Sequence, residues 1–145
     1  MKSKFIQKES QKAKTQALIF STGDAVVSEL IDFAGNKGLK SAYFTAIGAF
    51  SEATLFYYDW ESREYQEIPV NEQVEVLSLM GNITESDGKP KIHIHVTLGR
   101  VDGSVIGGHL KEAKVRPTLE LFLSEGSEKL QRTHDEKTGL ALINL

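Results

Sequence analysis

The stretch Lys91-Ile-His-Ile-His-Val-Thr-Leu-Gly-Arg-Val-Asp-Gly-Ser-Val-Ile-Gly-Gly-His-Leu110 contains three of the four histidines in the chain. Its apolar residues alternate on both sides of an Asp-Gly segment, which predicts two strands joined by a tight turn. His93 and His95 are two positions apart, so on a strand both side chains leave the same face. Two imidazoles on one face indicate a metal site, because neutral imidazole is the commonest protein ligand for zinc and similar ions.

The register of the hairpin decides where His109 lies. A two-residue turn would place His109 opposite Val96, on the wrong face. A three-residue loop, Val101-Asp102-Gly103, moves the register by one and places His109 opposite His95. We favour this loop because its third position is left-handed and suits glycine, although a bulge at Gly107-Gly108 would produce the same shift.

In this register His93, His95 and His109 meet on one face and are the predicted ligands of a divalent metal, with zinc favoured. Three protein nitrogens leave one tetrahedral position open, as in catalytic rather than structural zinc sites. Two alternatives stay open at this point: the histidines could be solvated polar residues, or a cluster at a subunit interface. The fourth histidine, His134, lies in a charged segment and is interpreted as an ordinary surface residue.

The rest of the chain predicts one main helix and a series of strands. Residues 25–37 carry apolar side chains at helical spacing, with Asp24 or Thr22 placed to cap the start and Gly35 or Gly38 to end it. Apolar or alternating runs predict strands at residues 15–21, 42–47, 52–60, 64–70, 74–83, 113–115, 118–124, 130–134 and 140–145. Strands joined by short turns, with one helix near the N-terminus, favour an α+β fold with an antiparallel or mixed sheet.

The composition is that of an ordinary globular protein. The 145 residues have the length of one domain and are 40% hydrophobic and 26% charged. Cysteine is absent, so a metal would have to be held by histidines and carboxylates. No apolar run approaches the roughly 20 residues of a membrane span, and the Lys-rich start lacks the apolar core of a signal peptide. The expected location is therefore the cytoplasm, without membrane contact.

Charge divides the chain into two parts. Residues 1–14 carry five lysines against Glu9, which leaves 12 basic and 19 acidic residues in the remainder. We therefore distinguish a basic N-terminal arm, residues 1–14, from a single domain, residues 15–145. The acidic domain is a poor partner for nucleic acid, because affinity for DNA comes mainly from Lys and Arg that neutralise phosphates.

Three further residues are candidates for catalysis beside the histidines. Glu75 and Glu120 could each orient an imidazole or act as a base, and Arg116 could hold a substrate carboxylate with two parallel hydrogen bonds. Arg100 could take the same role as Arg116. Each of these charges could equally be an ordinary surface residue.

The hairpin resembles the signature of the PPC domain, the plant and prokaryote conserved domain. The run from His93 to Leu110 carries most of the likeness, which extends to Gly23, Ala46-Ile-Gly-Ala49, Tyr57-Tyr58-Asp59 and Glu75-Val-Leu-Ser-Leu-Met-Gly81. The resemblance implies a compact α+β domain built on an antiparallel sheet and assembled as a homotrimer. In plant relatives the domain follows an AT-hook, a basic element that binds the DNA minor groove. The arm of this chain contains no Arg or Pro and has no such element.

The fold is also similar to that of acetolactate decarboxylase, whose zinc is held by a comparable His-x-His and a later histidine. This likeness implies the same three ligands here, His93, His95 and His109. Fold and ligands do not transfer an activity, because function is a property of the individual site.

Two main functions are compatible with these observations. The first is a cytoplasmic, zinc-binding homotrimer with a DNA-binding or regulatory role. The second is a small metalloenzyme, of lyase or hydrolase type, that acts on a small carboxylated molecule at the three-histidine site. A third interpretation is an interaction domain whose histidines stabilise the trimer. The sequence leaves open whether the protein is an enzyme.

Overall fold

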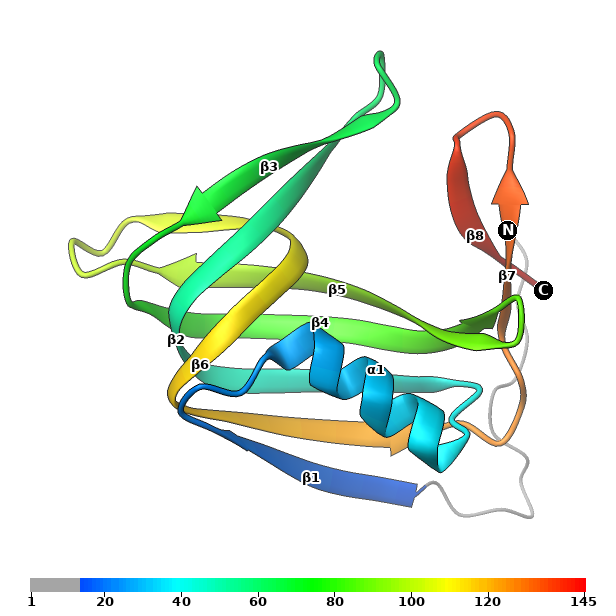
Figure 1. Cartoon of the computed structure of the whole chain (residues 1–145), viewed down its shortest axis with the longest axis horizontal. Coiled ribbons are helices and arrows are strands. Elements are labelled where there is room, and N and C mark those ends of the chain that lie inside the picture. Colours follow the sequence, from blue (N-terminus) through cyan, green and yellow to red (C-terminus); the bar gives the residue numbers. More distant parts are fainter. Residues whose placement is uncertain (1–13) are drawn as a thin grey trace.

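The structure, a computed structural model, describes residues 14–145, and it consists of strands with one helix (Figure 1). Apart from Lys14, the basic arm proposed at residues 1–14 lies outside the described residues. The elements in chain order are β1 (Lys14–Ser21), α1 (Val26–Lys37), β2 (Ala42–Asp59), β3 (Glu64–Val70), β4 (Val74–Ser86), β5 (Lys89–Gly99), β6 (Val105–Glu125), β7 (Gln131–Asp135) and β8 (Leu140–Asn144). This confirms the predicted α+β class with a single main helix near the N-terminus.

The strands form one mixed sheet that closes on itself. β2 pairs with both β4 and β6, while β5 lies between β4 and β6, so these four strands make a closed ring of antiparallel pairings. β1 pairs with β6 and β3 pairs with β2, both in antiparallel orientation, and β7 pairs with β4 in parallel orientation. The β2–β3 hairpin and the β7–β8 hairpin both project from the body of the sheet (Figure 1).

Two strands are longer than the sequence predicts. The strands expected at residues 42–47 and 52–60 are parts of one continuous strand, β2, whose register with β6 shifts between Gly48 and Phe50 and again between Phe50 and Glu52. β6 likewise continues through Pro117, where two separate strands were expected, with a cis bond between Arg116 and Pro117. The predicted interruptions were wrong because bulges bend a strand while its neighbours still pair with it.

The helix lies across the sheet and buries one apolar face. Val26, Leu30 and Ala34 are fully enclosed, and α1 packs against β5 and β6. Its end is as predicted, because Gly38 adopts a left-handed conformation with φ of 64° and its N–H donates to the helix backbone. Larger side chains from the strands complete the core: Phe44, Phe50, Leu55, Leu79, Ile83, Ile94, Leu98, Leu119, Leu121 and Leu123.

The start of the helix is capped from a distant strand. The expected caps were wrong: Asp24 accepts a hydrogen bond from the Ser21 N–H at 2.7 Å, and the Thr22 hydroxyl donates to the Pro117 carbonyl at 3.2 Å, so neither caps a helical N–H. Instead the carboxylate of Glu112, on β6, accepts from the N–H groups of Val27 and Ser28 at 2.7 and 3.0 Å. A carboxylate at this end satisfies free N–H groups and is favoured by the helix dipole.

Replacing Glu112 by alanine should therefore lower the free energy of unfolding by about 1–2 kcal/mol, because two helical N–H groups lose their acceptor. Urea unfolding of the two proteins would measure the difference. Glu120→Ala removes an exposed carboxylate from the same strand and should change stability by no more than about 0.5 kcal/mol. Equal effects of the two substitutions would contradict the capping role.

Within residues 14–145, no helix is both long and apolar enough to cross a membrane.

Candidate metal centre

The β5–β6 hairpin adopts the three-residue loop that the sequence favoured. Arg100 donates its N–H to the Ser104 carbonyl at 2.9 Å, and Gly103 donates to the Arg100 carbonyl at the same distance. Gly103 is left-handed, with φ of 82°. His109 consequently lies directly opposite His95. The predicted register is confirmed.

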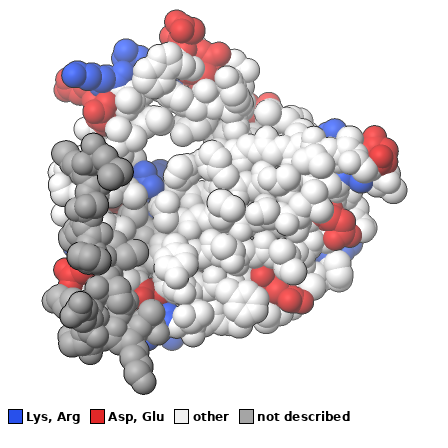
Figure 2. Space-filling view, turned by 180° about the vertical axis from the view of Figure 1, so that it is seen from behind, with Lys and Arg blue, Asp and Glu red and all other residues white. Residues whose placement is uncertain are grey.

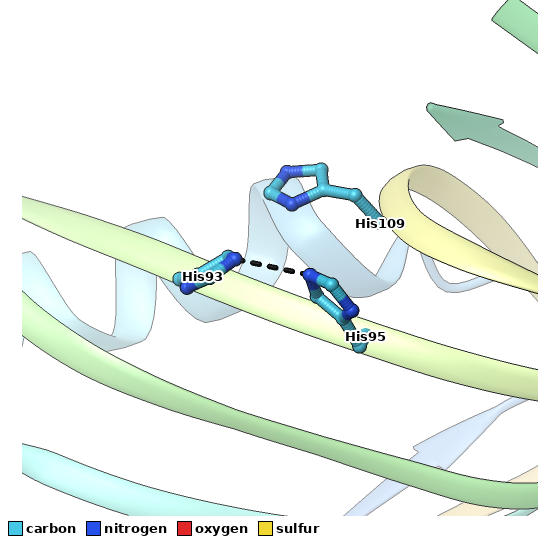
Figure 3. A group of neighbouring side chains, drawn as sticks. All are labelled: His93, His95 and His109. Atoms are coloured by element: carbon cyan, nitrogen blue, oxygen red, sulfur yellow. Dashed lines mark hydrogen bonds between the residues drawn. The ribbon is translucent and has the colours of Figure 1, made fainter. Parts of the chain in front are cut away.

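The three histidines converge on one side of the sheet (Figure 3). His93 and His95 project from β5 and His109 from β6, and one nitrogen from each ring lies within 4.8 Å of the other two. The Nε2 atoms of His93 and His95 are 3.1 Å apart. Two nitrogens bound to one tetrahedral zinc are separated by about 3.3 Å, given Zn–N bonds near 2.0–2.1 Å. The donor set and its spacing therefore fit a divalent metal after small ring rotations.

The environment favours neutral imidazoles, the form that binds metals. Burial lowers the pKa of His93, with smaller effects from His95, Arg132 and Lys91. Burial also lowers the pKa of His109 to about 4, assisted by His93 and His95. Protons therefore compete less with a metal at these rings than at an exposed histidine.

These shifts predict that the metal-free protein loses stability as the pH falls. A histidine whose pKa is lower in the folded state binds its proton more readily in the unfolded state. The contribution of neutral His109 to stability is therefore complete above about pH 6.5, the pKa of an unfolded histidine, and is lost as the pH falls toward the folded pKa of about 4. Urea unfolding between pH 7.5 and 4.5 should show this loss. The His109→Gln variant should lose less stability over the same pH range. Identical pH profiles for the wild-type and variant proteins would contradict the assignment of the loss to His109.

Glycines bring the three strands of the site close together. A Cβ atom on Gly81 of β4 would lie 2.5 Å from the His93 carbonyl oxygen, and one on Gly107 of β6 would lie 2.8 Å from the Val96 carbonyl oxygen. Real Cβ atoms do not approach backbone this closely, so a side chain at either position would move β5. The glycines beside the histidines thus fix the spacing of their strands.

The structure adds aromatic neighbours that the sequence analysis did not assign to the site. The ring of Tyr65 on β3 lies 5.7 Å from that of His109, and Phe56 on β2 lies 6.2 Å from the same ring. Tyr58 lies 5.0 Å from Tyr65. These residues reach the histidines because β2 pairs with β6 and carries β3 beside it. No local spacing in the sequence encodes that pairing.

Two polar neighbours also come from outside the hairpin. Asn82 on β4 lies opposite His93, and its side-chain oxygen accepts a hydrogen bond from Arg132 Nη2 at 3.0 Å. The position of Asn82 could have been found from the sequence, because a two-residue turn at Asp87-Gly88 pairs Asn82 with His93. No comparable signal identifies Arg132.

The candidate carboxylates lie elsewhere in the chain. Glu75 and Glu120 line a separate hollow of about 470 Å³ beside Gly48 and Pro117. Glu75 lies opposite Gly99, four positions along β5 from His95, a distance of about 13 Å along a strand. Within one chain neither carboxylate is placed next to the histidines.

The other basic and imidazole candidates are also outside the cluster. Arg116 is exposed on β6, directly before Pro117, and Arg100 forms an ion pair with Glu72 at 2.9 Å. His134 lies exposed on β7, in agreement with its interpretation as a surface residue.

Comparison with protein families identifies the chain. The model of the Plants and Prokaryotes Conserved (PCC) domain matches residues 7–127. The chain belongs to the PCC domain family. This is the family, also abbreviated PPC, that the hairpin signature resembles, so that resemblance is confirmed.

Three solved structures are similar to nearly the whole chain. A metal-containing protein from Archaeoglobus fulgidus is 41% identical, with a TM-score of 0.85, and the match covers 91% of this chain and 94% of that one. A PPC protein from Pyrococcus horikoshii is 33% identical, with a TM-score of 0.86 and coverage of 95% and 96%. A protein from Bacteroides thetaiotaomicron, described as a candidate DNA-binding protein, is 28% identical, with a TM-score of 0.87 and coverage of 92% and 96%.

Two further likenesses are more restricted. Curated bifunctional GlmU proteins of two Synechococcus strains are 29% identical over 126 residues, and the chain spans only 19% of their length. A Staphylococcus aureus protein similar to α-acetolactate decarboxylase is 11% identical, with a TM-score of 0.56, and covers 83% of this chain and 56% of that one. At that identity the likeness concerns the fold alone, and it agrees with the predicted similarity of fold.

Proposed function

We propose that this PCC-domain protein is a homotrimer that binds one divalent metal, zinc, per chain through His93, His95 and His109. The observation that carries the proposal is the convergence of three imidazole nitrogens within 4.8 Å. The 41% identical protein from Archaeoglobus fulgidus, described as metal-containing, supports it. The lowered pKa values of His93 and His109 support it further, because they keep the rings in the metal-binding form.

Elemental analysis of protein purified without a histidine tag tests the metal. The expected result is one zinc per chain after dialysis against zinc and then against buffer alone. Treatment with a chelator should remove the metal and lower the melting temperature, since a ligand that binds the folded state stabilises it. Less than about a tenth of a metal ion per chain would overturn the proposal.

The trimer is proposed from an exposed apolar face on the side of the sheet away from α1. Ile47, Met80 and Phe122 are 59%, 57% and 54% exposed. Phe122 lies opposite Thr45, Thr45 opposite Met80, and Met80 opposite His95, so this row of side chains runs across the sheet to the metal centre. Figure 2 shows a broad face with few charged side chains. Contiguous apolar surface of this kind commonly marks an interface between proteins.

Sedimentation velocity tests this assembly. The wild-type protein should sediment at three times the mass of one chain. Phe122→Glu should yield a folded monomer, because it would place a charge in the apolar interface. Lys114→Glu, at an exposed position elsewhere on β6, serves as the control and should leave the trimer intact. A wild-type monomer at micromolar concentration would refute the assembly.

A DNA-binding or regulatory role in the cytoplasm is proposed from the Bacteroides thetaiotaomicron relative, described as a candidate DNA-binding protein. In this chain the five lysines of residues 1–14 are the strongest concentration of basic charge. Binding should therefore weaken steeply with salt and disappear when residues 1–14 are deleted. Absence of binding at low salt would exclude this role and leave the metal site unaffected.

The alternative is a small metalloenzyme of lyase or hydrolase type. A divalent metal held by three imidazoles supplies a Lewis acid with an open coordination position. A hollow of about 490 Å³ adjoins His93 and His95 and is lined also by Tyr43, Met80 and Asn82. This space favours a small molecule next to the metal. Turnover of small carboxylated compounds that depends on zinc would support this alternative, and DNA binding without such turnover would favour the first role.

A further inference from the structure

Arg132 is a half-buried cation whose described partners are all neutral. Its guanidinium donates to the Thr84 hydroxyl at 2.9 Å, the Ala141 carbonyl at 2.8 Å and the Asn82 side-chain oxygen at 3.0 Å. A guanidinium has five N–H donors, so two are left for another acceptor. Among residues 14–145, none of the ion pairs includes Arg132. A partly desolvated cation of this kind is costly unless an anion accompanies it.

This guanidinium stands beside the metal centre. Asn82 and His93 are directly opposite on β4 and β5, so their side chains leave the same face within about 5 Å at Cβ. Arg132 donates to Asn82 and is thereby held next to His93. Lys91 is two positions before His93 on the same face of β5, opposite the buried Thr84.

The charged side chains that act on His93 and His109 are cations. Apart from the imidazoles themselves, Arg132 and Lys91 are the charged groups that lower the pKa of His93 and of His109. Burial lowers the pKa of Arg132, and the phenol of Tyr65 opposes that effect. The side of the site that carries Arg132 and Lys91 is therefore basic, in a chain whose net charge is −3.

The two projecting hairpins meet above this basic site. The Tyr58 hydroxyl, on β2, donates to the Thr138 carbonyl in the β7–β8 turn at 2.5 Å. Tyr65 connects Tyr58 to His109 through ring contacts of 5.0 and 5.7 Å, and on the other side β7 carries Arg132. Contacts thus lead from His109 through Tyr65 and Tyr58 to the β7–β8 turn, and from Arg132 on β7 through Asn82 back to His93. Figure 2 shows a hollow between the upper projection and the body of the molecule, with Lys or Arg atoms at its edge.

We propose that Arg132, assisted by Lys91, binds the carboxylate of a small organic acid in this hollow, next to the three histidines. The planar guanidinium matches a carboxylate, and the rings of Tyr65 and Phe56 provide a wall for the apolar part of the ligand. Arg132 thus takes the carboxylate-binding role that the sequence suggested for Arg116 or Arg100. The proposal rests on the metal site proposed above and specifies the ligand that accompanies it.

Benzoate and its uncharged analogue benzamide test the proposal by calorimetric titration of zinc-loaded protein. Benzoate should bind at least about 10-fold more tightly than benzamide, since only benzoate offers a carboxylate to the guanidinium. Arg132→Met should lower benzoate affinity by about 10-fold or more while zinc content stays at one per chain. Lys91→Met should lower it by a few-fold; the side chain is exposed, and the hydrogen bond of residue 91 to the Thr84 hydroxyl is made by its backbone carbonyl, which the substitution keeps. Lys114→Met, far along β6, is the control and should leave it unchanged.

Each outcome has a definite meaning. Equal affinity for benzoate and benzamide, or unchanged benzoate affinity in a folded Arg132→Met protein, would overturn the carboxylate site. Tighter binding of inorganic phosphate than of benzoate would overturn the assignment to a carboxylate. If Arg132→Met fails to fold, as judged by circular dichroism, the Lys91→Met titration decides. The protein could take up no zinc and still bind benzoate in a way that depends on Arg132 and Lys91. That result would overturn the metal site and support the carboxylate site.

Discussion

Replacing His109 or His95 by alanine is expected to lower the affinity for zinc by at least about 100-fold, because loss of a ligand should exceed the 10–100-fold effect of losing an outer-shell partner. Each variant would keep only two of the three histidine ligands, whereas zinc sites in proteins use at least three protein ligands. The decrease should appear in titrations against a competing chelator and in the zinc content of the purified variants.

The fourth histidine provides the matched control. His134 is exposed on β7, outside the cluster, and His134→Ala should retain one zinc per chain. The metal-free His109→Ala protein should remain folded, since the ring is only half-buried and its removal leaves no charged group without a partner. Full zinc content in the His95 and His109 variants would show that the metal is bound elsewhere.

Replacing Gly81 by alanine is expected to have the largest effect on stability, a loss of about 3 kcal/mol or more. The added methyl group would lie 2.5 Å from the His93 carbonyl oxygen and 2.5 Å from the Phe44 ring. The oxygen belongs to paired backbone and the ring is fully buried, so neither moves without disturbing the sheet. Because β5 carries two of the histidines, the variant should also bind zinc more weakly. Urea unfolding and zinc titration measure the two effects.

Gly35→Ala is the control for adding the same methyl group. Gly35 lies in α1, and its added Cβ would meet only the Pro90 side chain, at 4.0 Å. Alanine is favoured over glycine in a helix, so this variant should be unchanged or more stable by up to about 1 kcal/mol. A Gly81 variant as stable as the Gly35 variant would refute the close approach of β4 and β5.

The histidine hairpin was the part of the site that could be predicted from the sequence. Its geometry depends on interactions between near neighbours: the alternation of side chains along a strand and the need for a left-handed residue at Gly103. These place His109 opposite His95 without reference to the rest of the molecule. The end of α1 at Gly38 was predictable for the same reason, since a left-handed cap is a local feature.

The remainder of the site could not be predicted in this way. Glu75 and Glu120 were candidates because carboxylates suit the chemistry, but their positions depend on how β2, β4 and β6 pair, and that pairing places both beside Gly48. Arg132 and Tyr65 were not considered, because they are separated from the histidines by long stretches of chain. Sequence spacing carries no information about such distant neighbours.

The sequence by itself determined the class of fold, the register of the hairpin and the convergence of three imidazoles. The tertiary structure decided the closure of the sheet through β2, the capping of α1 by Glu112, the hydrogen bond of Arg132 to Asn82, and the contact of Tyr58 with the β7–β8 turn. The physical reason is the range of the interactions. Strand alternation and turn conformation depend on residues a few positions apart, so they can be read from the sequence. Burial and the pairing of distant strands bring together residues that are far apart in the chain, and their separation in the sequence does not predict which of them make contact.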